Sequence, residues 1–161
     1  MIDYIYGHND VVSSFVASLI PAARNRGFGR CSTIGVINDD GDLIAGIVYH
    51  NWNPEAGVIE LSGAALPGSN WLTRETLKHM YRYPFLQIGC QMVMQMTAEE
   101  DERTLRQLAA FNYSFILIPR ILGPDKNGVV CLLTREAWEE NKVCKRYRHH
   151  IPEDQPAERA A

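Results

Sequence analysis

The sequence lacks any apolar run approaching the ~20 residues that a membrane-spanning helix needs. Its first residues, Met1 to Tyr4, also lack the charged and apolar regions of a signal peptide. We therefore expect a cytoplasmic protein with no membrane partner. A net charge of −3 predicts no general attraction to nucleic acid or anionic lipid, although a local basic patch can still act.

The four cysteines are widely spaced and form no C-x-x-C pair. A disulfide framework is not expected in a cytosolic chain, so we predict free, buried thiols. A zinc site built from Cys144, His149 and His150 would need a distant ligand and has no recognised spacing. We therefore predict no metal site.

No internal repeat is present, and 161 residues suit one domain with a buried core. We expect that single domain over residues 1–150. Residues 151–161 are polar and rich in proline and alanine, which predicts a disordered tail.

The hydrophobic periodicity predicts strands alternating with helices. The expected strands cover residues 4–7, 32–39, 43–52, 58–65, 90–98, 113–122 and 127–134. The first expected helix begins near His8, with Asn9 or Asp10 as its cap, and is stopped by Pro21. The other expected helices cover residues 72–83 approximately (ended by Pro84), 99–111 and 135–143. Asp40-Gly41 is a strong hairpin signal. This order predicts an α/β fold with a mixed sheet.

Two of the apolar strands each carry one ionisable residue, His50 in the first and Glu60 in the second. If the turn between them closes symmetrically, His50 lies opposite Glu60, close enough for a hydrogen bond. The residues on that strand face are Val48, His50, Trp52, Val58, Glu60 and Ser62. A slip of one residue would separate the pair, and an ordinary polar pair on a solvated face remains the alternative.

The polar turn from Pro67 to Arg74 opens a helix. A helix start offers unpaired amides and a partial positive charge, and can therefore hold a phosphate. Ser69 or Asn70 could cap it, and Thr73 and Arg74 could add a hydroxyl and a guanidinium. A capped helix with a surface arginine is the alternative.

Over residues 27–142 the chain resembles the GNAT superfamily of acyl-CoA-dependent N-acyltransferases. The segments that carry the resemblance are "GDLIAGIVYHNW…GVIELSGAA", "PGSNWLTRETLKHMYRYPF" and "AEEDERTLRQLAAFNY". The resemblance implies a central, mostly antiparallel sheet of about seven strands flanked by helices, acetyl-CoA as cofactor and an amine acceptor of unknown class. In this chain Gly68 is the only glycine of the pyrophosphate turn, and Leu108 stands where many relatives have a tyrosine.

The resemblance also implies roles for particular residues. Glu60 is the expected base, and His50 either acts as the base or orients Glu60. Tyr113 is the candidate acid for the departing thiolate, with core packing as its alternative. A backbone amide near Gly63 would meet the oxyanion. The expected cofactor contacts are Leu61, Gly63, Ala64, Gly68, Ser69, Asn70, Thr73 and Arg74. A Ser62–His50–Glu60 triad is not expected, because flat paired strands lack the strained elbow of a nucleophile.

Two further readings stay open. The "YHNW" hairpin and the chain end resemble phage- and prophage-encoded members, which include enzymes like the Mom-type DNA adenine modifiers. DNA contact would then run through a basic segment comprising Lys142, Lys145, Arg146 and Arg148. The other reading is a catalytically silent interaction module. Either a monomer or a homodimer is expected.

Overall fold

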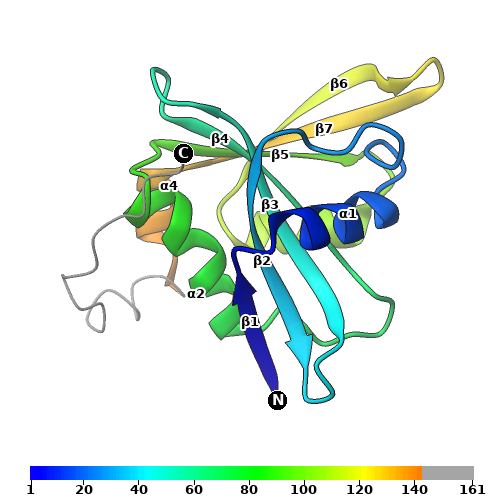
Figure 1. The fold of residues 1–161 in the computed structure, drawn as a ribbon. Helices are drawn as coiled ribbons and strands as arrows, with labels where there is room; N and C mark the ends of the chain where they lie inside the picture. The colour runs from blue at the N-terminus through cyan, green and yellow to red at the C-terminus, as the bar shows by residue number, and fades with distance from the viewer. Residues whose placement is uncertain (143–161) are drawn as a thin grey trace. The chain divides into compact units, whose positions relative to one another are not determined.

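A computed structural model of the chain describes residues 1–142 (Figure 1). The predicted α/β fold, with seven mostly antiparallel strands and flanking helices, is confirmed. The chain divides into two compact units: Met1–Trp52 with Ile59–Tyr81, and Asn53–Val58 with the chain from Arg82 onward. The single domain over 1–150 stays a prediction, and the tail at 151–161 lies outside the described residues. No helix in the described part is long and apolar enough to cross a membrane.

The first unit is built on four neighbouring strands in the order β1-β2-β3-β4. They are β1 (Ile2–Tyr6), β2 (Cys31–Asn38), β3 (Leu43–Asn53) and β4 (Val58–Ala65). β2 pairs antiparallel with both β1 and β3. The hairpin predicted at Asp40-Gly41 is confirmed, because Gly41 has φ 82° and its amide donates to the Asn38 carbonyl.

α1 (Asn9–Leu19) packs on one face of these strands. Val12 and Val16 are fully buried against Val48 of β3. The predicted cap was wrong, because Asn9 Oδ1 accepts from the Thr33 amide and hydroxyl, both at 3.0 Å. The Asn9 side chain therefore ties α1 to β2, and the helix has no side-chain cap.

Gly46 of β3 is the point of closest approach between α1 and the strands. A Cβ placed there would lie 2.6 Å from Val16 Cγ2 and 2.9 Å from Val12 Cγ1. We expect Gly46→Val to lower the free energy of unfolding by about 1–3 kcal/mol or more, because branched carbons must displace α1. Gly68→Ala, at an open position with φ 76°, provides a comparison in which only the backbone conformation resists the change. Thermal unfolding of both variants checks this, and a Gly46→Val midpoint equal to wild type would contradict the packing.

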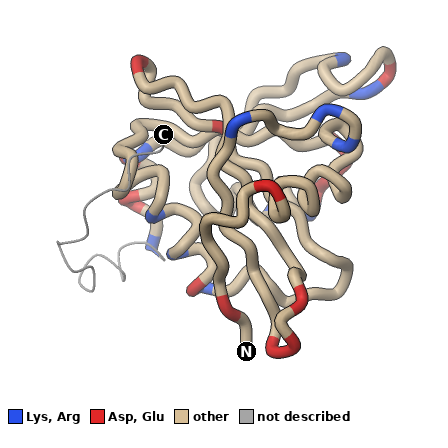
Figure 2. The backbone as a smooth tube through the Cα atoms, in the orientation of Figure 1, with Lys and Arg blue, Asp and Glu red and all other residues tan. Residues whose placement is uncertain are grey.

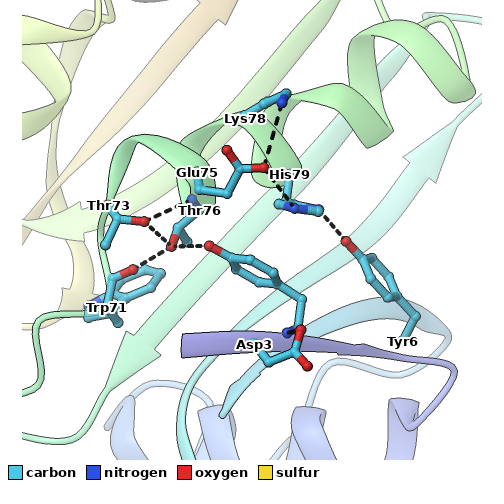
Figure 3. Close-up of polar contacts among 9 residues, drawn as sticks. Asp3, Tyr6, Trp71, Thr73, Glu75, Thr76, Lys78 and His79 are labelled. Atoms are coloured by element: carbon cyan, nitrogen blue, oxygen red, sulfur yellow. Dashed lines mark hydrogen bonds and ion pairs between the residues drawn. The ribbon is translucent and has the colours of Figure 1, made fainter. Parts of the chain in front are cut away.

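α2 (Arg74–Arg82) covers the opposite face of the first unit through polar contacts with β1 (Figure 3) and with β3. The Tyr4 hydroxyl lies 3.0 Å from Thr76 Oγ1, and the Tyr4 ring stacks on His79. Tyr49 donates to the Met80 carbonyl. These contacts hold both ends of α2 against the strands.

The boundaries of α2 differ from those predicted. The helix begins at Arg74 rather than Leu72, because the Thr73 hydroxyl caps it by accepting from the Thr76 amide at 3.1 Å. Pro84 does not end the helical path, which continues as a π-helical turn, η1 (Tyr83–Gln87). Pro84 lies in the first turn of η1 and has no N–H to donate, and the carbonyl four residues before it, that of Met80, accepts from the Tyr49 hydroxyl instead.

The second unit contains three antiparallel strands in the order β5-β7-β6. They are β5 (Met92–Ala98), β6 (Ser114–Gly123) and β7 (Lys126–Thr134), accompanied by α3 (Glu102–Ala110) and α4 (Arg135–Glu140). Phe85 stacks on Trp138 with ring centroids 4.8 Å apart. Asp101 caps α3 by accepting from the Thr104 amide.

The thiols in the described residues are free, as predicted. Cys90 and Cys131 are fully buried, and burial raises their pKa values to about 12 and about 11. Burial also raises the pKa of Cys31. These thiols are therefore protonated at neutral pH and suited to packing rather than to nucleophilic chemistry. Cys144 lies outside the described residues.

Candidate active site

His50 of β3 is a buried imidazole, with 7% of its surface exposed. The Phe28 ring contacts it at a tilt of 52°, with centroids 4.8 Å apart, and Cys31 of β2 is the residue opposite His50 in the strand pairing. Burial lowers the pKa of His50 below its ordinary value of 6.5, and the nearby charge of Glu60 opposes part of that shift. His50 is therefore neutral at pH 7 and can accept a proton.

His50 lies beside both Glu60, its predicted partner, and Ser62, which was expected on the same strand face but not as a partner. His50 Nε2 is 2.9 Å from Ser62 Oγ, within hydrogen-bond distance. His50 Nδ1 is 3.9 Å from Glu60 Oε2, which is too long for the direct bond that we expected. The carboxylate acts on the ring as a nearby charge, which favours the proton on Nδ1 and leaves Nε2 as the acceptor toward Ser62.

Asn51 holds Glu60 in place, a contact that the sequence analysis missed. Asn51 has φ 50° and its Nδ2 donates to Glu60 Oε2 at 2.8 Å. Asparagine tolerates this left-handed conformation better than most residues. The asparagine next to His50 was therefore the sequence feature that could have indicated it. The assumption of a flat strand was wrong here, because β3 is distorted next to the imidazole. The distortion lies beside the base and not at Ser62.

The predicted phosphate-binding turn uses its side chains differently from expectation. Neither Ser69 nor Asn70 caps α2; Ser69 Oγ donates to the Leu66 carbonyl at 2.6 Å. The Thr73 hydroxyl is the cap, and it also lies 3.0 Å from the Thr76 hydroxyl, so its hydrogen bonds are made within the start of the helix. What remains is the exposed Arg74 side chain and those amides of the first turn that neither the helix nor the Thr73 cap uses. Gly68 turns the chain with φ 76° ahead of them.

The β4 residues expected to contact a cofactor differ in exposure. Leu61 is buried, and Ala64 packs against the core beneath α1. Their side chains are thus structural, so that only their backbone groups are left for a ligand. Gly63 is exposed, which makes it the most open of the three.

Tyr113 lies in the second unit, where its side chain is buried and its hydroxyl accepts from Gln95 Nε2 at 2.6 Å. Tyr113 counts among the buried core residues, which agrees with the core-packing alternative, and its role as an acid stays a prediction. Of the basic segment, Lys142 is exposed, and Lys145, Arg146 and Arg148 lie outside the described residues. Within residues 1–142, no three His, Cys, Asp or Glu side chains gather in a way that could hold a metal ion.

Comparison with known proteins shows what this fold is similar to. No protein-family model matches the chain, and a search of curated proteins finds no match. The spermidine N-acetyltransferase from Vibrio cholerae matches at a TM-score of 0.67 and 9% identity, over 88% of this chain and 98% of that one. A GCN5-related N-acetyltransferase from Brucella melitensis matches at 0.62 and 13%, over 92% and 81%. The chain spans 65% of another acetyltransferase structure. At these identities the likeness is one of fold, and this chain has the fold of the GNAT N-acetyltransferases.

Proposed function

We propose that the protein is an acyl-CoA-dependent N-acyltransferase that moves an acetyl group to an amine. The observation that carries this proposal is the buried, neutral His50 bonded to Ser62 within the acetyltransferase fold. Amide formation needs a base that takes a proton from the attacking amine. An imidazole serves this purpose near neutral pH better than a carboxylate, whose ordinary pKa of about 4.3 lies further from it.

Because His50 is almost fully buried, a substrate amine reaches it through Ser62. Ser62 is half-buried, and its hydroxyl is within hydrogen-bond distance of Nε2. The amine proton passes to Ser62 Oγ as the Ser62 proton passes to Nε2. Glu60, held by Asn51, stabilises the imidazolium that forms. Glu60 thus supports His50, in contrast to the expectation from the sequence that Glu60 is the base.

Acetyl-CoA is the proposed acyl donor, and the start of α2 suits its diphosphate. The open amides of the first turn and the Arg74 guanidinium provide donors for phosphate oxygens. When bound, the cofactor supplies an acyl group activated as a thioester. The backbone near Gly63 is exposed and provides an amide for the oxyanion.

Thermal unfolding with acetyl-CoA tests the proposal. At about 100 times Kd the ligand stabilises a protein by about 2.7 kcal/mol, which raises the unfolding midpoint visibly. We expect Arg74→Ala to reduce this shift at fixed ligand while leaving the midpoint without ligand unchanged. Arg103→Ala, an exposed arginine on α3, removes a comparable charge as the control. No shift with wild type at millimolar acetyl-CoA would favour the silent interaction module.

The DNA adenine modifier receives no separate support from the described residues. The residues that favoured this function were those of the basic segment, and three of these four lie outside the described residues. A nucleobase amine remains one of the acceptor classes that the proposed chemistry allows.

A further inference from the structure

The loop between α1 and β2 is rich in arginine and lacks acids. Arg24, Arg26 and Arg30 are all exposed, and no Asp or Glu occurs from Pro21 to Asn38. Figure 2 shows separate blue patches and no red along this loop, whereas red occurs at several other turns. A local positive field of this kind stands out in a chain of net charge −3.

These three guanidinium groups are not committed to partners. Within residues 1–142, none of them takes part in an ion pair or in a side-chain hydrogen bond. Arg135 shows the contrast, since its side chain binds both Glu139 and the Phe85 carbonyl. Each open guanidinium offers five N–H donors in a planar fork that matches carboxylate and phosphate oxygens.

The loop also reaches the candidate base. Phe28 packs its ring against His50, and it is flanked by Gly27 with φ 64° and Gly29 with φ 68°. These two left-handed residues turn the chain sharply on both sides of the ring, as glycine does at little cost. Arg26 and Arg30 lie two residues before and two residues after Phe28, whose ring contacts the imidazole.

We propose that this arginine loop, residues 24–30, binds an oxyanion of the acceptor, so that the acceptor is an amine that also carries a phosphate or a carboxylate. This inference rests on the proposed function, because it assigns the substrate class of the same site. Glu60, exposed at 18% of its side chain, attracts the amine end of such a molecule while the arginines attract its anionic end. The two charges orient a bipolar acceptor with its amine toward Ser62.

The test uses acceptors that differ only in the anion. Phosphoethanolamine is compared with ethanolamine, and tyrosine with tyramine, at fixed acetyl-CoA, by release of the CoA thiol. We expect kcat/KM to be about tenfold or more higher for the anionic member of at least one pair, as a charge-assisted hydrogen bond allows. A preference for phosphoethanolamine over ethanolamine identifies phosphate as the recognised anion. A preference for tyrosine over tyramine identifies carboxylate. Arg26→Ala and Arg30→Ala should remove the preference through KM, and Arg26→Lys should retain part of it.

Asn25→Ala is the matched control, because Asn25 lies exposed between two of the arginines and carries no charge. Equal kcat/KM within both pairs, or a preference that survives both arginine variants, would overturn the inference. Direct binding of phosphoethanolamine and tyrosine by NMR titration without acetyl-CoA separates the two proposals. Binding that depends on Arg26, in a protein that ignores acetyl-CoA, would refute the acyltransferase and keep the anion site.

Discussion

Replacing His50 by glutamine lowers kcat/KM for acyl transfer by about 10²–10⁴-fold, the contribution of a general base. Glutamine cannot accept a proton, yet it can keep a hydrogen bond to Ser62 Oγ. The loss should therefore fall on kcat, with the affinity for acetyl-CoA little changed. Initial rates of CoA thiol release measure the effect, and thermal unfolding confirms that the variant is folded. Rates within about threefold of wild type would remove His50 from the mechanism.

The pH profile separates His50 from Glu60. His50 works as a base only when neutral, so wild-type kcat/KM should fall as the pH drops through the imidazole pKa, which burial places below 6.5. His50→Gln should lack this acidic limb. Glu60 raises the pKa of His50, so Glu60→Gln should move the limb to lower pH and weaken the base. If Glu60 were the base itself, Glu60→Gln would instead lower kcat/KM by the large factor that we expect for His50→Gln.

The proximity of His50 and Glu60 could be predicted, because it depends only on the number of residues that separate each of them from the turn between their strands. Strand side chains alternate with a period of two, so a symmetric turn brings them to one face. The exact bonds could not be predicted, because they depend on the backbone of Asn51. One left-handed residue in β3 gives the carboxylate a second donor and leaves Ser62 as the partner of Nε2.

The errors at helix starts share one physical cause. Asparagine, serine and threonine can bond to the backbone of their own helix or to another element, and local sequence does not rank these choices. Asn9 binds β2, Ser69 closes a turn, and Thr73 takes the capping role. The strands were more predictable because apolar periodicity extends over many residues, whereas each cap depends on a single side chain.

Replacing Ser62 by alanine should lower kcat/KM by about 10²-fold or more, because the buried imidazole then loses the hydroxyl that connects it to the substrate. Ser62→Thr keeps a hydroxyl, and its kcat/KM should stay within about tenfold of wild type. The double variant with His50→Gln and Ser62→Ala should lose little more kcat/KM than either single variant, because the two residues act as a unit. The same thiol-release assay measures all three, with acetyl-CoA thermal shifts as the binding control. A relay also predicts a larger solvent isotope effect for wild type than for Ser62→Ala, since two protons move together. Wild-type rates in Ser62→Ala would refute the relay, and a stable acetyl group on Ser62 in intact-mass spectra would replace it with a covalent route.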